Sequence, residues 1–190
     1  MNILKQIYPA IAITVTLTVL LGIVYPLAVT GLAQVIFPRQ AAGSLIEKDG
    51  RVIGSQLIGQ PFAGPGYFHS RPSAAGRRYD GAASGGTNLG PTSRTLFETN
   101  VKAAADALRE DNPDMPIPVD LVTASASGLD PHITPAAAEF QIPRIARERR
   151  MNESVLRALV SRHTEGRQLG FLGEPRVNVL ELNLALDEHR

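Results

Sequence analysis

The sequence predicts an α+β protein: one N-terminal transmembrane helix followed by a single soluble α+β domain. No charged residue or histidine occurs from Gln6 to Pro38, and apolar residues dominate this run. About 20 apolar residues suffice to cross the hydrocarbon core of a bilayer, and this run is longer. The rest of the chain mixes helix and strand patterns and has the usual size of one domain. We therefore expect a short tail at residues 1–7, a transmembrane helix at 8–37 and a soluble domain at 38–190.

A cleaved signal peptide is the alternative interpretation of the apolar run. Lys5 supplies a charged start, and Gly31-Leu32-Ala33 offers small residues for cleavage before Gln34. The apolar region of a signal peptide usually has about 7–15 residues, whereas this run is longer and contains Pro26. These features favour an uncleaved anchor.

Small residues recur every four positions along the expected helix, at Ala10, Thr14, Thr18 and Gly22. Residues four apart lie on one helix face, and small side chains allow close helix packing in lipid. The pattern predicts a face for a partner helix, although a helix surrounded by lipid is the alternative. Pro26 follows one turn later, where it should kink the helix or end its regular part.

The soluble part begins with a predicted β-hairpin. Segments 44–48 and 51–58 flank Asp49-Gly50, and a type I′ turn favours such residues because both central positions need positive φ. Residues 59–91 then show neither helical nor strand periodicity. Long irregular segments in compact domains are usually functional or disordered. The aromatic residues of this segment favour an ordered loop: Phe62, Tyr67, Phe68 and Tyr79.

The remaining elements follow from periodicity and capping residues. We expect a helix at 93–110, a short strand at 118–124, a helix from Thr134-Pro135 towards Arg150 with a break at Pro143, a helix capped by Asn152, and a strand-like start at 176–186 whose end is undecided.

Composition excludes several functions. The chain has no cysteine, which excludes a disulfide framework and cysteine-based metal or redox chemistry. Its net charge of +1 argues against nucleic acid as a partner. No metal site is expected, because the histidines are far apart and lack the H-E-x-x-H spacing: His69, His132, His163 and His189. The arginines from 144 to 157 are interpreted as a solvated helix face.

Catalytic motifs are scarce. The Gly-rich segment 81–90 lacks the lysine of a phosphate-binding loop, so we interpret it as a surface loop. Ser127, Asp130 and His132 contain the residue types of a hydrolase triad, but they crowd into one short loop without a nucleophile-elbow motif. No catalytic residue is therefore assigned.

Several motifs carry a family resemblance. They are GIVYP at 22–26, GSQLIGQPF at 54–62, YFHSRPSA at 67–74, SGGTNL at 84–89, VTASASGLDPHITPAAAEFQIPRIAR at 122–147 and RVNVLELNLALD at 176–187. Together they resemble the C subunit of the Kdp-type potassium-transporting ATPase along nearly the whole chain. Departures are minor: Thr87 stands where the family often has Ser, and Pro131 occupies a variable position.

The resemblance implies a non-catalytic accessory subunit needed for assembly of a high-affinity potassium uptake complex. Its implied partners are a channel-like potassium-binding subunit, a P-type ATPase subunit and a very small membrane subunit, besides the lipid bilayer. ATP and potassium would be handled by these partners, and the chain would bind no cofactor of its own. It lacks the DKTG motif of a phosphorylated pump subunit. The family is also described as raising the ATP affinity of the pump.

The resemblance also implies an orientation in the cell inner membrane: a cytoplasmic N-terminus and an extracytoplasmic domain. Lysine and arginine counts slightly favour the reverse, but large domains translocate largely regardless of such charges. An external domain cannot touch a cytoplasmic nucleotide, so any effect on ATP would pass through helix contacts.

The family-like motifs at 59–89 and 125–134 are hypothesised to dock on the channel-like subunit near its outer potassium entrance. The first-choice docking residues are Tyr67, Phe68, Arg71, Asn88 and Asp130, because aromatic residues and arginine are favoured interface anchors. The alternative is that these motifs only fold the domain. Two other functions stay open: a membrane-anchored periplasmic hydrolase using loops 59–91 or 125–132, and a binding protein released by signal-peptide cleavage.

Overall fold

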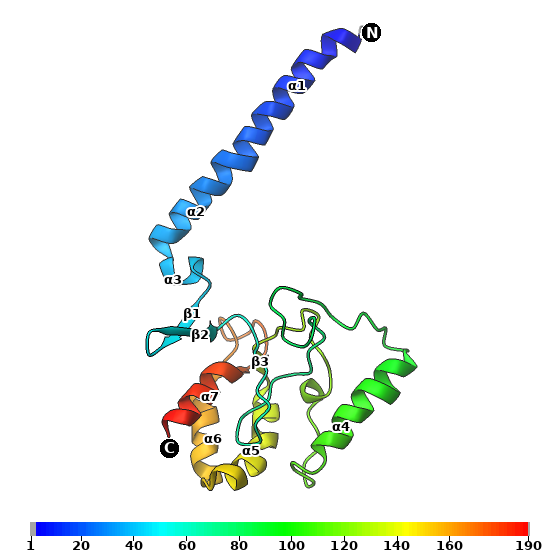
Figure 1. Cartoon of the computed structure of the whole chain (residues 1–190), viewed down its shortest axis with the longest axis vertical. Coiled ribbons are helices and arrows are strands. Elements are labelled where there is room, and N and C mark those ends of the chain that lie inside the picture. Colours follow the sequence, from blue (N-terminus) through cyan, green and yellow to red (C-terminus); the bar gives the residue numbers. More distant parts are fainter. Residues whose placement is uncertain (1–2, 190) are drawn as a thin grey trace. The chain divides into compact units, whose positions relative to one another are not determined.

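The structure is a computed structural model that describes residues 3–189. The chain divides into two compact units, Met1–Leu45 and Ile46–Arg190 (Figure 1). The second unit mixes helices with small sheets, which confirms the α+β fold class.

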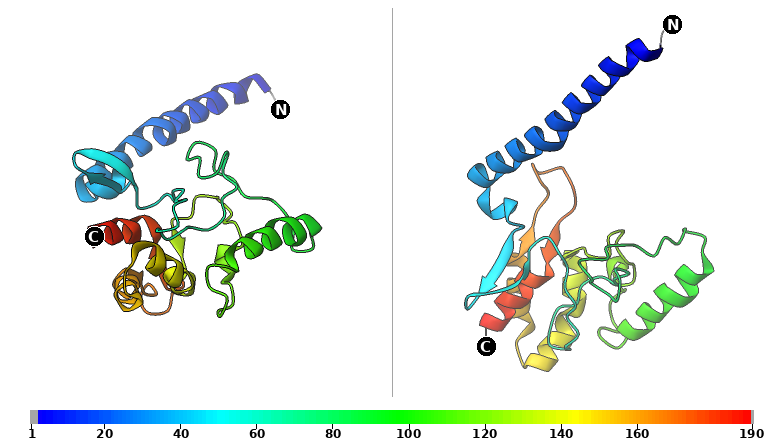
Figure 2. Two further views of the ribbon diagram at one scale, coloured as in Figure 1. Left: turned by 60° about the horizontal axis from the view of Figure 1, so that its bottom comes forward. Right: turned by 45° about the horizontal axis from the view of Figure 1, so that its top comes forward.

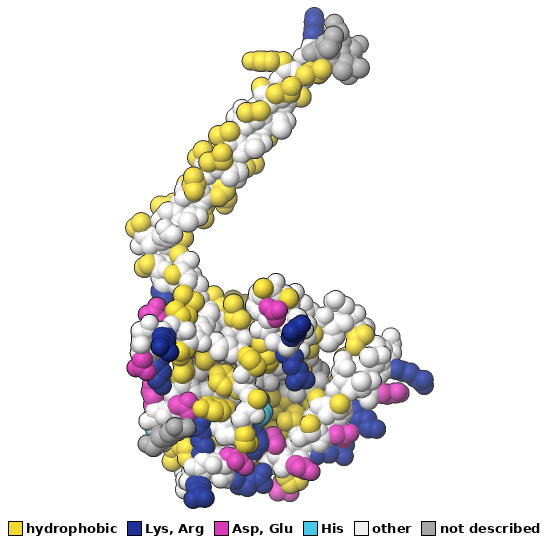
Figure 3. All heavy atoms as spheres, in the orientation of Figure 1, with side chains coloured by type: hydrophobic (Ala, Val, Ile, Leu, Met, Phe, Trp, Pro, Cys, Tyr) yellow, Lys and Arg dark blue, Asp and Glu magenta, His cyan; other side chains and the backbone are white. Residues whose placement is uncertain are grey.

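The first unit is dominated by one long apolar helix. It comprises α1 (Ile3–Val19), the π-turn η1 (Leu20–Val24) and α2 (Tyr25–Ile36), and the short helix α3 (Pro38–Ala41) follows. The segment Lys5–Ile36 has a mean hydropathy of 2.2 and is long and apolar enough to cross a membrane. Figure 3 shows apolar side chains along its length.

Pro26 interrupts the regular geometry of this helix, as the sequence predicts. It lies in the first turn of α2, directly after the π-turn. Proline lacks an N–H and its ring clashes with the carbonyl four residues earlier, and a wider π-turn relieves such crowding. The helix begins at Ile3, before the expected Tyr8; residues 1–2 of the expected tail lie outside the described residues.

The second unit opens with the predicted hairpin of β1 (Leu45–Lys48) and β2 (Arg51–Ser55). Asp49 and Gly50 have φ values of 53° and 72°. Both central residues therefore adopt the left-handed backbone conformation with positive φ, which confirms the expected turn.

Three helices and a small sheet build the core of this unit (Figures 1 and 2). The helices are α5 (Pro135–Arg149), α6 (Glu153–Arg162) and α7 (Val179–Glu188), and the antiparallel sheet has the order β3 (His132–Ile133), β5 (Arg176–Asn178), β4 (Thr164–Glu165). In the sheet, Val177 is paired with both Ile133 and Thr164. Burying a large apolar side chain stabilises a fold by about 1.5–3 kcal/mol, and the core contains Phe140, Ile142, Ile145, Leu156, Leu159, Val177, Leu182 and Leu186.

Side-chain caps fix where the core helices begin. Thr134 Oγ1 accepts a hydrogen bond from the Ala137 N–H at 3.1 Å, and Asn152 Oδ1 accepts one from the Ser154 N–H at 2.9 Å. Both caps confirm the sequence prediction. The undecided C-terminal segment resolves at Asn178, which ends β5 and caps α7.

Two sequence predictions about this unit are wrong. Residues 118–124 contain the short 3₁₀ helix η3 (Val119–Leu121) rather than a strand, because Asp120 turns inward to accept two hydrogen bonds from Thr134.

The break expected at Pro143 is also absent, because Pro143 lies inside a continuous α5. A proline inside a helix costs about 3 kcal/mol through the lost hydrogen bond and the clash of its ring, but Ile142 and Arg144 on either side are buried and hold the helix in place.

The predicted helix at 93–110 forms as η2 (Thr95–Val101) and α4 (Lys102–Leu108). Its first half has π-helical geometry, and none of its residues is buried.

Buried polar side chains hold the irregular segment 64–70 against the helices. Asn183 of α7 accepts from the Phe68 N–H and donates to the Phe68 carbonyl, both at 2.9 Å. Gln141 of α5 does the same for His69, at 2.7 and 3.1 Å. Arg144 donates to the carbonyls of Pro65 and Tyr67 and pairs with Asp111 at 2.9 Å. These amides and the guanidinium satisfy the backbone where a neighbouring strand would otherwise be needed.

The arginine segment is therefore not a uniformly solvated face, which corrects the sequence interpretation. Arg144 is buried. Arg149 is mostly covered, pairs with Asp187 at 2.8 Å and donates to the Gly66 carbonyl.

Replacing Asn183 tests this support. Asn183→Leu leaves the N–H and carbonyl of Phe68 buried without partners, and each unsatisfied group costs about 1–3 kcal/mol. We expect the free energy of unfolding to fall by about 3 kcal/mol in urea titrations of the full chain in detergent. Asn100→Leu, at an exposed position of η2, is the matched control. Equal stability of the two variants would contradict the role assigned to Asn183.

Candidate functional site

Two irregular segments, residues 59–91 and 122–134, lie against one another and form one surface, here named the loop platform. Backbone bonds join them: the Gly59 N–H donates to the Leu129 carbonyl at 2.8 Å, and the Gly85 N–H donates to the Ser127 carbonyl at 2.9 Å. Ser73 Oγ also donates to the Gly128 carbonyl at 2.6 Å. The platform is thus an ordered structure, as its aromatic content predicts.

Close backbone approach requires glycine at several junctions of the platform. Gly128 has a φ of 67°, and a Cβ atom there would lie 2.6 Å from the Ala75 nitrogen. A Cβ atom at Gly59 would lie 2.6 Å from the Asp130 carbonyl oxygen. Neither contact is sterically allowed, so these glycines permit the two segments to touch.

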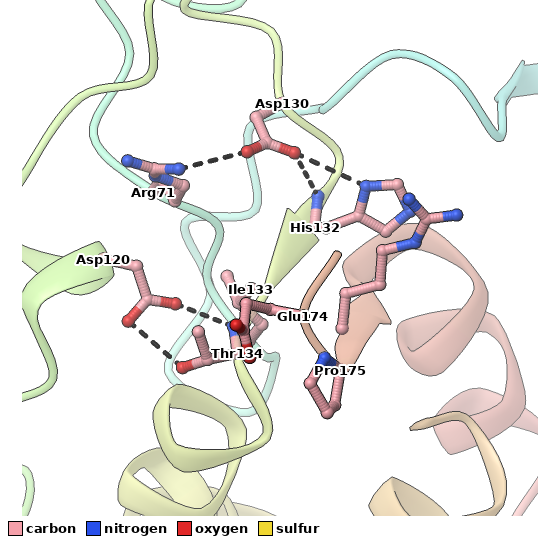
Figure 4. Close-up of a pocket in the computed structure, with 9 residues that line it drawn as sticks. Arg71, Asp120, Asp130, His132, Ile133, Thr134, Glu174 and Pro175 are labelled. Carbon is pink, nitrogen blue, oxygen red and sulfur yellow. Dashed lines mark hydrogen bonds and ion pairs between the residues drawn. The ribbon is translucent and has the colours of Figure 1, made fainter. Parts of the chain in front are cut away.

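A cluster of Arg71, Asp130 and His132 joins the two segments of the platform (Figure 4). Arg71 Nη1 is 3.1 Å from Asp130 Oδ2, and Asp130 Oδ1 accepts from the His132 N–H at 3.0 Å. Burial acts to raise the pKa of Asp130, but hydrogen bonds from His132 and the charge of Arg71 outweigh it, and the net pKa is lowered. The carboxylate is therefore ionised and paired. The Tyr79 hydroxyl donates to the Arg71 carbonyl, and burial raises the pKa of this hydroxyl.

The cluster borders a pocket of about 280 Å³ that Glu174 and Pro175 also line (Figure 4), together with Arg176. Its other charged groups also have partners. Glu174 pairs with Arg167 at 2.6 Å, Arg176 with Glu165 at 2.9 Å, and Asp120 accepts from Thr134. The charges around the pocket therefore connect segments of the domain to one another.

The sequence candidates for hydrolysis are only partly brought together. Asp130 Oδ1 lies 3.5 Å from His132 Nδ1. Ser127 Oγ instead accepts from the Leu129 N–H at 3.1 Å and lies 3.5 Å from Ser125 Oγ. A triad needs a hydrogen bond between nucleophile and base, and within residues 3–189 no hydrogen bond joins Ser127 to His132. In the same part of the chain, no group of three or more histidine or acidic side chains could hold a metal ion.

The five proposed docking residues occupy different environments. Arg71 and Asp130 are paired and partly exposed, and Asn88 is exposed with a φ of 54°. Tyr67 packs on Phe62 and lies under the Arg149 guanidinium, 4.5 Å from the ring centroid.

Phe68 differs from the other four, because its side chain is fully buried in the core. It cannot reach a partner while the domain stays folded, so we remove it from the docking residues.

Sequence reasoning missed the residues that support the platform: Gln141, Arg144 and Asn183. Each is buried on a helix face that is otherwise apolar. A polar residue at such a position is the signal that could have found them, since buried polar groups are almost always hydrogen-bonded.

His69 gives the platform a pH-dependent stability. Its Nε2 lies 3.0 Å from the Gly64 carbonyl oxygen. Burial, followed by the charge of Arg144, lowers its pKa below the ordinary 6.5. The unfolded chain therefore binds a proton more readily, and stability falls as the pH drops below 6.5. The lowered pKa of Asp130 acts in the same direction, but only below its ordinary value of 3.8.

We therefore expect the full chain to lose free energy of unfolding between pH 7.5 and 5.5. His69→Gln removes the titrating ring, so this variant should lose less over the same range. Urea titrations at both pH values measure the difference. Identical pH dependence in the two proteins would show that His69 does not titrate with folding.

Comparison with known proteins identifies the family. The family described as "K+-transporting ATPase, c chain" matches residues 7–188. A protein from Koribacter versatilis named "Potassium-transporting ATPase KdpC subunit" is 63% identical, over 96% of this chain and 94% of its own length. A protein of the same name from Sorangium cellulosum is 58% identical, over 98% of this chain and 100% of its own length. Another from Rhodopseudomonas palustris is 56% identical, over 97% of this chain and 98% of its own length. The chain therefore belongs to the family of c chains of K+-transporting ATPases.

Proposed function

We propose that this chain is a non-catalytic, membrane-anchored accessory subunit of a potassium-transporting ATPase complex, needed for its assembly. The relatives are named as subunits of such an ATPase. The observation that carries the proposal is the loop platform, an ordered surface that contains several of the family-like motifs and is held by side chains of α5 and α7. Functional surfaces are commonly loops held by a rigid scaffold.

The central ion pair of the platform suits burial against another protein, because Arg71 and Asp130 neutralise each other. An unpaired charge is costly to bury, whereas a paired and hydrogen-bonded one is tolerated. We assign the platform to the channel-like potassium-binding subunit, near its outer potassium entrance, with Tyr67, Arg71, Asn88 and Asp130 as contact residues.

The membrane helix is assigned to contacts with the other membrane chains, including the P-type ATPase subunit and the very small membrane subunit. In this proposal the partners handle ATP and potassium. Any effect of the chain on ATP affinity then passes through contacts between membrane helices. Such coupling requires a structural element with two states, whose equilibrium shifts both with these helix contacts and with ATP binding.

Docking through the platform can be tested on two exposed alanines. Ala82 lies on the platform and Ala158 on α6. A bulky charge on a buried interface prevents close contact, so Ala82→Arg should lose co-purification with the partner subunits in mild detergent and growth at low potassium. Ala158→Arg should retain both. Unchanged thermal melting of both variants shows that the domain stays folded.

Arg71→Ala is the stricter variant, because it removes a proposed contact. A folded Arg71→Ala domain that no longer joins the complex supports docking. A domain that melts shows a purely structural role, and a complex that assembles with both Ala82→Arg and Arg71→Ala rules out docking through this surface.

The stripe of small residues is proposed as the helix-packing face. Ala10, Thr14 and Thr18 lie in α1, whereas Gly22 lies in the π-turn, where a Cβ atom would meet nothing within 4 Å. Gly22→Leu and Thr18→Leu should each weaken assembly, because larger side chains prevent close helix approach. Leu20→Phe, on another face, should be milder. Equal yields of complex from all three variants would show that the stripe faces lipid.

The proposed orientation has a cytoplasmic N-terminus and an extracytoplasmic domain in the cell inner membrane. Protease added to intact spheroplasts should then digest the domain. Complete protection until the cells are lysed would place the domain inside.

A further inference from the structure

The loop between β4 and β5 presents an apolar tip at residues 169–172. Leu169 is 82% exposed and Phe171 is 69% exposed, and Leu172 is also exposed. The tip contains no side chain with a hydrogen-bonding group. Lone exposed apolar residues are common, but a cluster of them marks an interaction site.

The tip has a defined shape. Gln168 and Leu172 exchange two backbone hydrogen bonds at 2.9 Å, and Arg167 pairs with Glu174 at 2.6 Å across the base of the loop. Leu169 adopts a φ of 53°, which costs energy for a branched side chain. The loop therefore holds its apolar side chains outwards in a fixed turn.

Three of the four backbone N–H groups of the tip are satisfied within the loop itself. The N–H of Gly170 donates to the Arg167 carbonyl at 3.2 Å, and those of Phe171 and Leu172 donate to the Gln168 carbonyl at 3.2 and 2.9 Å. A protein partner can supply hydrogen bonds to a loop, but hydrocarbon cannot. Internal pairing of these N–H groups lowers the cost of moving the tip towards lipid.

A bilayer is within reach of this domain. Residues 37–45 alone separate the apolar helix from Ile46, and nine residues span at most about 30 Å. Within the second unit, the loop lies at the same end as the β1–β2 hairpin in the view of Figure 1, and the chain enters the unit at that hairpin. The pair of Arg167 and Glu174 leaves the base of the loop without net charge to oppose a lipid surface.

From the apolar tip, its paired N–H groups and the short tether, we propose that residues 169–172 insert into the boundary between headgroups and acyl chains of the bilayer that holds this chain's own helix. The tip is then a second membrane contact that restricts rotation of the domain about its tether. Apolar side chains such as Leu and Phe are suited to this boundary. The proposal rests on the membrane anchor and is independent of assembly with other subunits.

Tryptophan quenching tests the insertion directly, because the chain has no native tryptophan. Full-length Phe171→Trp is reconstituted in phosphatidylcholine vesicles whose acyl chains are brominated. Its emission should shift to the blue, lose intensity to the brominated lipid and resist acrylamide. Val119→Trp is the control, because Val119 is 70% exposed in the same domain, and its emission should remain sensitive to acrylamide and insensitive to the lipid.

A second variant links the signal to the tip. Adding Leu169→Asp and Leu172→Asp to Phe171→Trp should restore emission and acrylamide access with unchanged melting, because carboxylates do not enter the acyl region. Equal lipid quenching of Phe171→Trp and Val119→Trp, or no quenching of either, overturns the proposal. So does shielding of Phe171→Trp from both quenchers in the assembled complex, which would show that a protein covers the tip.

Discussion

Buried backbone N–H and carbonyl groups need hydrogen-bond partners. In this domain, buried side chains rather than a neighbouring strand supply those partners to the long loop. Asn183 and Gln141 each bind both backbone groups of one residue, Phe68 and His69, and Arg144 takes the carbonyls of Pro65 and Tyr67. The loop can therefore run across the helices with the Phe68 side chain in the core. The position of segment 64–70 depends on these three side chains.

This arrangement connects the core to the proposed docking surface. The helices that form the core, α5 and α7, also carry the side chains that hold segment 64–70. The rest of the platform is then fixed by Ser73, by close glycine contacts and by the pair of Arg71 and Asp130. The charges of Arg71 and Asp130 are engaged in holding segments together, which is compatible with the docking role proposed for this surface.

Local signals predicted much of this fold. The uncharged run to Pro38, the Asp49-Gly50 turn and the caps at Thr134 and Asn152 each act over a few residues, so the sequence displays them directly. Predictions failed where distant contacts decided the outcome: Asp120 turned towards Thr134 instead of extending a strand, and burial of Ile142 and Arg144 carried α5 through Pro143. Within the candidate site, the loop and its ordered character were predictable. The pairing of Arg71 with Asp130 and the burial of Phe68 were not, because both depend on residues more than 50 positions away.

Hydrogen exchange of backbone amides tests the central claim most directly, since it reports the protection of each N–H group. The amides of Phe68 and His69 lie outside any helix or strand. If buried side chains hold them, they should exchange as slowly as amides in the middle of α5 and far more slowly than those of the exposed loop at 81–84. Exchange at the rate of that exposed loop would contradict the account, because the platform would then lack the fixed support on which its proposed function depends.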